Sequence, residues 1–250
     1  MVSLFNENCQ NRLPLIQEKS VDLILIDPPY LISRKSGFAN SGPNTTVECA
    51  RKFGGYKTDF GEWDKNDLDL TFVLEEFYRI LKNGGTLIMF YDFWKLQEVK
   101  EIAETIGFKQ PRLGCWNKTN PVPVNSKKNY LSNGKEFFVS FVKKSKPTFN
   151  SEYDTGDYYF EETQERFDTY FYPICHGKER SPHPTQKPLE LTKQLVLKHS
   201  NEGDLVLDCF AGSGTTGAAC SELKRNCILI ETEPIYCDII KNRIQGVVVQ

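Results

Sequence analysis

The chain has 250 residues, a formal net charge of −2 and 26% charged residues, which is typical of a globular α/β domain and not of a disordered or strongly basic protein. Apolar runs fall well short of the roughly 20 residues of a membrane span, and the first residues lack the segments of a signal peptide, so we expect a cytoplasmic protein without a membrane partner. The eight cysteines form no C-x-x-C pair, which argues against a zinc site or a disulfide framework, and we expect no metal.

The first two predicted strands flank a short helix. Val2 to Phe5 is an apolar run, and Asn8 follows it at a position where a polar group could face a ligand. A short helix is expected from Leu13 to Glu18. The next strand, Val21 to Ile26, is rich in branched apolar side chains, as in the buried strands of a parallel sheet.

That strand runs into Asp27-Pro28-Pro29-Tyr30, a stiff turn because neither proline has an N–H with which to continue a ladder. In open α/β sheets, ligands bind at the carboxyl ends of the strands. The carboxylate, the free carbonyls and the aromatic face suit a planar ring with an exocyclic amine, because they accept its N–H groups and stack on it. The alternative is an ordinary strand-to-loop turn, in which Asp and Pro are common.

The middle of the chain combines polar loops with periodic segments. Residues 31–66 are polar, with basic, aromatic and glycine residues, and we interpret them as a mobile loop near the active site; the alternative is a merely solvated loop. A helix is predicted from Leu70 to Leu81, ended by Asn83-Gly84-Gly85. A strand from Thr86 to Tyr91 and a helix from Phe93 to Ile106 follow.

Two further strands, Arg112 to Trp116 and Glu136 to Val142, are expected to form an antiparallel pair. Residues 143–182 are polar and lack a helical period, and we interpret them as an insertion or a small recognition module, not as core. His183-Pro184-Thr185-Gln186-Lys187-Pro188 then opens a helix, with Pro188 at its first helical position.

A second group of motifs lies near the end of the chain. Asp204 to Asp208 is a predicted buried strand that enters a glycine-rich turn and a helix over residues 209–219. The strand Cys227 to Ile230 ends at Glu231, and a last helix covers Pro234 to Ile244. This layout binds a nucleoside, because the glycines let a ligand approach the backbone and the acid pairs with ribose hydroxyls.

Two cofactors, NAD and S-adenosylmethionine, are compatible with the sequence of this turn. Gly212, Gly214 and Gly217 match the G-x-G-x-x-G spacing of dinucleotide-binding proteins, which leaves an NAD-dependent oxidoreductase as one alternative. Asp208 ends the strand just ahead of the turn, where a carboxylate would repel a pyrophosphate but suit the cationic head of S-adenosylmethionine.

With both groups of motifs, the chain resembles the DNA amino-methyltransferases, which methylate N6 of adenine or N4 of cytosine. Asp27-Pro28-Pro29-Tyr30 resembles their catalytic motif, and the stretch from Asp208 to Gly214 resembles their cofactor motif. The catalytic motif comes first, and the stretch from His183 to Pro188 lies just before the cofactor motif, an order similar to the permuted β group. Cys209 stands where the family usually has proline, a departure that leaves the binding turn intact.

The resemblance implies one Rossmann-like α/β methyltransferase domain over residues 1–250, with seven mostly parallel strands, one antiparallel strand and helices on both faces. Its implied catalytic residues are Asp27, Pro28, Pro29 and Tyr30. The residues implied to bind S-adenosylmethionine are Asn8, Asp27, Thr185, Lys187, Asp208, Phe210, Gly212, Ser213, Gly214, Thr215, Thr216 and Glu231. Among these, Thr185 and Lys187 would meet the carboxylate end of the cofactor and Glu231 the ribose. Residues 143–182 occupy the place of the target recognition segment.

The function that follows is methylation of adenine N6 in DNA, because the catalytic motif begins with Asp27, whereas relatives that act on cytosine more often begin with Ser. Cytosine N4 is the alternative within the class, and a catalytically silent DNA-binding module is the alternative from another class. The resemblance also suggests a cognate restriction endonuclease and a homodimer as partners beside DNA.

Overall fold

The computed structural model describes residues 1–29, 68–121, 134–144, 146–151 and 168–250. Met1–Pro28 and Leu70–Gln250 together form one compact unit. Tyr30 and the predicted loop of residues 31–66 lie outside the described residues.

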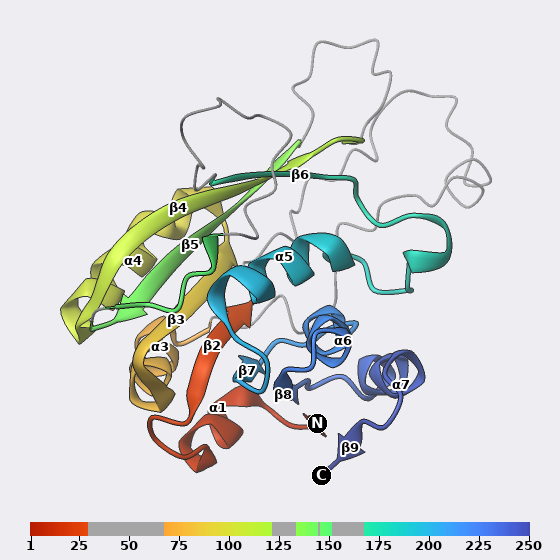
Figure 1. Ribbon diagram of the computed structural model, residues 1–250, viewed down its shortest axis with the longest axis horizontal. Coiled ribbons are helices and arrows are strands. Elements are labelled where there is room, and N and C mark those ends of the chain that lie inside the picture. Colours follow the sequence, from red (N-terminus) through yellow and green to blue (C-terminus); the bar gives the residue numbers. More distant parts are fainter. Residues whose placement is uncertain (30–67, 122–133, 145, 152–167) are drawn as a thin grey trace, which may run out of the picture. The chain divides into compact units, whose positions relative to one another are not determined.

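A single sheet forms the centre of this unit, with the strand order β6-β4-β5-β3-β2-β7-β8-β1-β9 (Figure 1). Every neighbouring pair is parallel except those of β5, which runs antiparallel to both β3 and β4, so the predicted single antiparallel strand is confirmed. The strands are β1 (Val2–Phe5), β2 (Val21–Ile26), β3 (Leu81–Tyr91), β4 (Phe108–Lys118), β5 (Lys135–Lys143), β6 (Thr169–Tyr172), β7 (Leu205–Asp208), β8 (Asn226–Ile230) and β9 (Val248–Val249).

The described part of the sheet has nine strands, whereas the resemblance implies seven. The two additional strands, β6 and β9, are short and lie at the two edges. The β6 strand falls within residues 143–182, and its Tyr170 is buried among core residues, so this part of the predicted insertion belongs to the sheet. Residues 145 and 152–167 of that segment lie outside the described residues.

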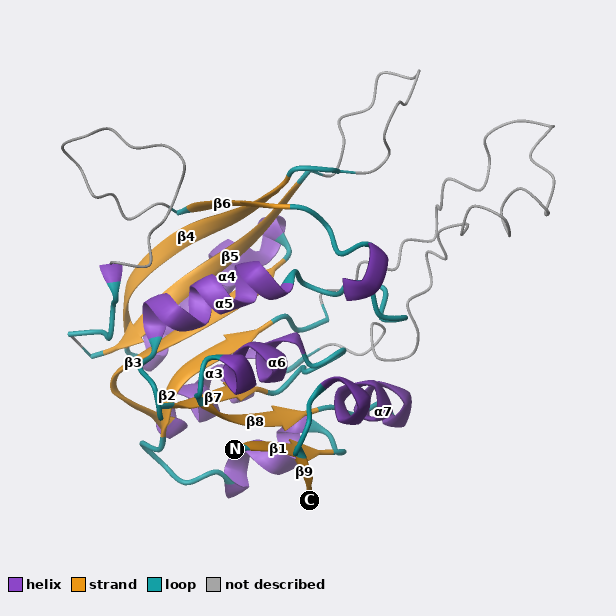
Figure 2. Ribbon diagram, turned by 45° about the vertical axis from the view of Figure 1, so that its right-hand side comes forward, coloured by secondary structure: helices purple, strands orange, loops and turns teal. Residues whose placement is uncertain are grey.

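Helices cover both faces of the sheet (Figure 2). On one face, Leu191 of α5 and Ala218 of α6 belong to the same buried cluster as the β2 and β3 side chains Leu25 and Phe90. The alternate β2 residues point to the opposite face, which α3 and α4 cover (Figures 1 and 2). The helices are α1 (Cys9–Arg12), η1 (Leu13–Leu15), α3 (Leu70–Ile80), η4 (Phe93–Lys95), α4 (Leu96–Ile106), η6 (Gly177–Glu179), α5 (Leu189–His199), α6 (Thr215–Glu222) and α7 (Pro234–Arg243).

Three predicted boundaries were wrong, each for a local reason. The first helix begins at Cys9, not Leu13, because the Asn8 side chain caps it by accepting a hydrogen bond from Gln10 N at 2.8 Å. Asn83-Gly84-Gly85 lies inside β3 and does not end α3, although Gly84 does adopt a positive φ of 84°. Pro188 is the extended residue before α5, with ψ of 137°, so the helix starts one residue later than predicted.

Within the described residues, no helix combines the length and the apolar character needed to cross a bilayer.

Candidate active site

Three carboxylates meet at the carboxyl edge of the sheet. The strands β2, β7 and β8 are parallel neighbours, with Ile24 opposite Leu207 and Asp208 opposite Leu229. Their carboxyl ends therefore lie at one edge, which brings together Asp27, Asp208 and Glu231. They lie together because each acid follows or ends a buried apolar strand, as predicted for each one separately.

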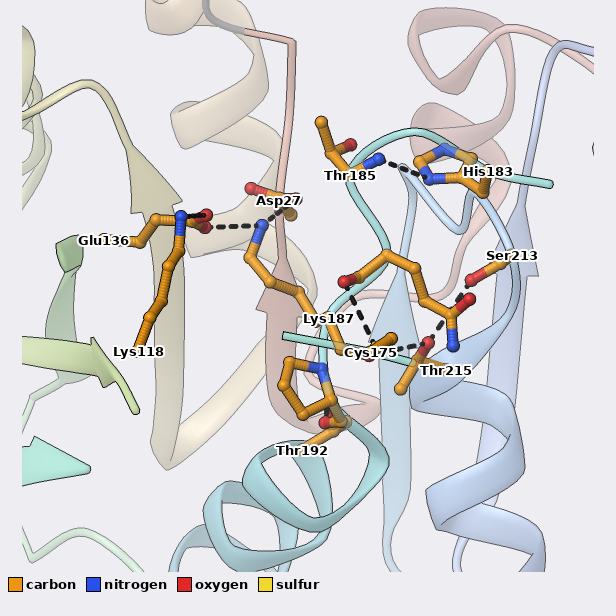
Figure 3. A network of polar contacts seen from close by, with 12 residues as sticks. Asp27, Lys118, Glu136, Cys175, His183, Thr185, Lys187, Thr192, Ser213 and Thr215 are labelled. Carbon is orange, nitrogen blue, oxygen red and sulfur yellow. Dashed lines mark hydrogen bonds and ion pairs between the residues drawn. The ribbon is translucent and has the colours of Figure 1, made fainter. Parts of the chain in front are cut away.

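Asp27 has one oxygen engaged and one available. Its Oδ2 forms an ion pair with the Lys187 ammonium (Figure 3). Its Oδ1 is buried and has no hydrogen-bond partner among the described residues. Burial raises the pKa of Asp27, while the charge of Lys187 opposes the rise. The free Oδ1 is thus a hydrogen-bond acceptor at the sheet edge that still lacks a donor.

A fourth acid, Glu136, lies in the same site, and the sequence analysis did not identify it as a site residue. It comes near the start of β5, and its Oε2 lies 3.0 Å from Lys187 Nζ (Figure 3). Its Oε1 lies 2.7 Å from the ammonium of Lys118. Burial opposes ionisation of Glu136, but the two ammonium groups outweigh it and hold its pKa below the usual value.

The antiparallel pairing of β4 and β5 explains why Glu136 reaches the site. A strand that runs against parallel neighbours begins where they end, and Trp116 near the end of β4 pairs with Glu136. The predicted antiparallel pair therefore contained the signal that would have placed Glu136 at this edge.

The glycine-rich turn adopts a left-handed geometry and is bonded to Glu231. Gly212 and Gly214 have φ of 51° and 75°, in the left-handed region that favours glycine. Gly212 N donates a hydrogen bond of 2.7 Å to Glu231 Oε2, and Gly214 is the residue before α6. The predicted strand, turn and helix are thus confirmed, and the Glu231 carboxylate is fixed against the turn.

Asp208 and Glu231 are buried acids that form no ion pair within the described part of the chain. Burial raises the pKa of Asp208 to about 7, and the negative charges of Asp27 and Glu231 also raise it. The hydrogen bond that Asp208 accepts from Phe210 N, at 3.1 Å, opposes this rise. Burial likewise raises the pKa of Glu231. These acids disfavour an anionic ligand, and a cationic ligand would stabilise their ionised forms.

The polar side chains of the turn already have protein partners. Arg243, in the last turn of α7, donates to Thr215 Oγ1 at 3.0 Å and to Ser213 Oγ at 3.3 Å. The Thr216 hydroxyl lies near the Asp208 carboxyl and lowers its pKa. Arg243 could not be predicted from the sequence, because a basic residue in the last turn of a surface helix is common and belongs to no motif.

Three residues implied to contact the cofactor have other partners in the structure. The ammonium of Lys187 is held by two carboxylates, and Thr185 N donates to His183 Nδ1 at 3.3 Å. The side-chain oxygen of Asn8 caps α1. Cofactor contacts by these three residues, and stacking by Tyr30, stay predictions.

The chain matches a family model, a known relative and solved structures. A family model described as DNA methylase, of the N6 and N4 type, matches residues 21–242. The type II methyltransferase M.HinfI of Haemophilus influenzae is 33% identical over 260 residues, which span 98% of this chain and 68% of the relative.

Solved structures agree with this match. The crystal structure of the M1.HpyAVI–SAM complex has a TM-score of 0.70 at 25% identity, over 98% of this chain and 100% of that chain. The PvuII DNA methyltransferase, which is cytosine-N4-specific, shares the fold with a TM-score of 0.67 at 16% identity, over 100% of this chain and 94% of that chain.

Proposed function

We propose that this chain, which belongs to the N6/N4 DNA methylase family, methylates N6 of adenine in DNA. Because the chain belongs to this family, it is a DNA methyltransferase with S-adenosylmethionine as its cofactor. The single observation that supports amine methylation is the buried Oδ1 of Asp27, an acceptor without a donor among the described residues.

The residues of the turn fit the cofactor. S-adenosylmethionine is a sulfonium cation, and when bound it supplies an electrophilic methyl group. Asp208 and Glu231 are buried acids with raised pKa values, so binding a cation beside them is favourable. Gly212 and Gly214 give the turn the left-handed geometry that leads into α6, at the edge of the sheet where ligands bind in open α/β folds. The hydroxyl groups of Ser213, Thr215 and Thr216 complete the proposed binding set.

Asp27 and Pro28 would activate the amine. An exocyclic aromatic amine is a poor nucleophile because its lone pair is delocalised into the ring. Accepting its two N–H groups, at Asp27 Oδ1 and the Pro28 carbonyl, favours the tetrahedral nitrogen that carries positive charge in the transition state. No covalent bond to the protein is required. A hydrogen bond to a charged acceptor is worth about 1.5–3 kcal/mol, and Asp27 would then take up the proton that the methylated nitrogen releases.

The target base must leave the duplex to reach this site. Extruding a base costs a few kcal/mol of stacking and pairing. Tyr30 follows the two prolines of the turn, and we propose that its ring stacks on the extruded base, as an aromatic face can. Residues 143–182 remain our candidate for target recognition. A restriction endonuclease partner and a homodimer also remain proposals.

Cytosine N4 is the second candidate, and the fold shared with the cytosine-N4-specific PvuII enzyme favours it. Both bases present an amine with two N–H groups, so the acceptor geometry at Asp27 serves either one. The aspartate at the start of the catalytic motif is our reason to prefer adenine, by resemblance.

The test is to express the chain in a bacterial host that lacks DNA methylation and to sequence its genome by a method that detects modified bases in single molecules. We expect N6-methyladenine in one short recurring sequence. N4-methylcytosine in such a sequence would overturn the choice of base, and an unmodified genome alongside measurable cofactor binding would favour the silent module. An Asp27→Ala chain expressed in the same host is the control for background modification.

A further inference from the structure

Four charged side chains form a continuous series that ends at Asp27. Lys118 Nζ lies 2.7 Å from Glu136 Oε1, Glu136 Oε2 lies 3.0 Å from Lys187 Nζ, and Lys187 pairs with Asp27 Oδ2 (Figure 3). The series joins the β4–β5 pair, the loop before α5 and the end of β2. These three elements are far apart in the sequence, and the charges connect them at the substrate edge of the sheet.

The series is too buried to be an ordinary surface ion pair. The side chains of Lys187 and Lys118 are only 10% and 11% exposed. Removing such charges from water costs several kcal/mol per ion, so a series of this kind is a weak source of stability compared with apolar packing. The series lies beside Asp27, which points to a role in catalysis and not in stability.

The backbone holds Glu136 in place independently of Asp27. Glu136 pairs with Trp116 across the β4–β5 ladder, and Lys118 is its diagonal neighbour on the same face. Lys118 N also donates to Gly134 O at 2.8 Å, which secures the end of the ladder. Glu136 is therefore a fixed point from which Lys187 can be oriented.

We propose that Glu136 and Lys187 are positioning residues for methyl transfer, in which Glu136 orients the Lys187 ammonium and Lys187 holds Asp27 Oδ2 so that Oδ1 faces the amine. This inference rests on the proposed role of Asp27 and adds two residues to it. Glu136 carries no assigned role from the motifs, and Lys187 changes from an implied cofactor ligand to a residue that acts through Asp27.

The series also balances charge around Asp27. The charged groups that face it are Lys187 from the loop before α5, Glu136 and Lys118 from the β4–β5 pair, and Asp208 at the end of β7. Burial raises the pKa of Asp27, Lys187 lowers it and Glu136 raises it. Replacing Lys187 by a neutral residue should therefore make Asp27 harder to ionise, whereas replacing Glu136 by glutamine should make it easier.

These opposite signs define the experiment. Initial rates of methyl transfer to unmethylated bacterial DNA are measured from pH 5 to 9 at saturating S-adenosylmethionine and DNA, so that the acidic limb of kcat reports the enzyme–substrate complex. Lys187→Met should move that limb to higher pH and lower kcat at pH 7 by about tenfold to a hundredfold, the scale of a misplaced reacting group. Glu136→Gln should move the limb to lower pH while lowering the plateau.

Two further variants separate positioning from loss of structure. Lys187→Arg keeps the charge and should return the limb to the wild-type position. Lys82→Met removes an ion pair of 2.8 Å with Asp22. Asp22 lies at the opposite end of β2 from Asp27, so this variant should leave both the limb and kcat unchanged. The thermal midpoint of every variant shows whether it is folded at the assay temperature.

Three results would overturn the inference while the wild-type enzyme still methylates DNA. The limb could stay in place in both variants, or move in the same direction in both. Alternatively, Lys187→Met could weaken cofactor binding, measured by calorimetry, with kcat unchanged, which would return Lys187 to the role of a cofactor ligand. Absence of methyl transfer by the wild-type chain would instead count against the proposed function.

Discussion

His183 lies directly over Gly212, so that a Cβ on this glycine would come within 2.8 Å of the imidazole Nε2. The imidazole also packs edge-on against Tyr236, with ring centroids 4.5 Å apart, which limits its freedom to move away. Burial lowers the pKa of His183 to about 4, so the ring is neutral at pH 7. The stretch from His183 to Pro188 and the glycine-rich turn are thus in direct contact, although they lie apart in the sequence.

This contact predicts the effect of Gly212→Ala. The left-handed φ of 51° costs an alanine roughly 1–2 kcal/mol, and the contact with His183 adds to that strain. We expect a lower thermal midpoint and weaker binding of S-adenosylmethionine by calorimetry. A second substitution, His183→Ala, should relieve only the part due to the contact. A Gly212→Ala chain that binds the cofactor as wild type would contradict this account of the turn.

Asp27→Asn tests the charge of the acceptor at constant shape. The amide keeps one oxygen but loses the negative charge that stabilises the developing cation, so kcat should fall by about a hundredfold or more. The dissociation constant for S-adenosylmethionine, measured by calorimetry, reports separately the cofactor contact that the family resemblance implies for Asp27. Activity within tenfold of wild type would exclude Asp27 as the amine acceptor.

Asp208 predicts a pH dependence of cofactor affinity. Because its pKa in the free protein is about 7, protonation below that pH removes a negative charge that a cationic ligand needs. Affinity for S-adenosylmethionine should therefore fall as the pH decreases from 8 to 6. Asp208→Asn should bind weakly at every pH, without this slope. Titration calorimetry at three pH values measures both, and a slope that persists in Asp208→Asn would assign it to another group.

The raised pKa of Asp208 also affects stability. A rise in pH favours cofactor binding but destabilises the cofactor-free protein. A carboxyl group whose pKa is raised on folding, from 3.8 to about 7, is protonated in the folded state at a pH where the unfolded chain has lost the proton. Its contribution therefore destabilises the cofactor-free protein as the pH rises between these values. Asp208→Asn should raise the thermal midpoint of the cofactor-free protein at pH 8 more than at pH 5. Equal changes at both pH values would contradict the shift.

Gly114→Ala tests the packing of the aromatic side chains next to the site. A Cβ at Gly114 would come within 2.0 Å of the Phe138 ring, which packs against Phe90 with centroids 5.0 Å apart. Overpacking of this kind costs about 1–3 kcal/mol. The packing adjoins the site, because Lys187 Nζ lies 5.1 Å from the centre of the Phe90 ring. We expect a lower midpoint of denaturant unfolding with an unchanged slope, and cofactor affinity close to wild type. An unchanged midpoint would mean that Phe138 moves aside at no cost.

The elements that the sequence predicted best are the buried strands and the groups at their ends. Val21 to Ile26 and the strand that ends at Asp208 are apolar runs, and a parallel sheet aligns their carboxyl ends whatever the connections between them. That is why Asp27, Asp208 and Glu231, each predicted at the end of a strand, lie at one edge of the sheet.

The parts that the sequence missed depend on contacts between distant residues. Glu136 enters the site only through the antiparallel direction of β5, and its pairing with Lys187 leaves no local pattern. The strand β6 has four residues, too few for a period, and exists because β4 offers it an edge. The start of the first helix shows a local error, since Asn8 just before Cys9 is a common type of helix cap.

The most direct test of the central claim is to incubate the purified chain with unmethylated bacterial DNA and S-adenosylmethionine, digest the DNA to nucleosides and identify the modified one by mass spectrometry. The account predicts N6-methyldeoxyadenosine from the wild-type chain and background levels from Asp27→Ala. N4-methyldeoxycytidine, or equal modification by the two chains, would contradict it.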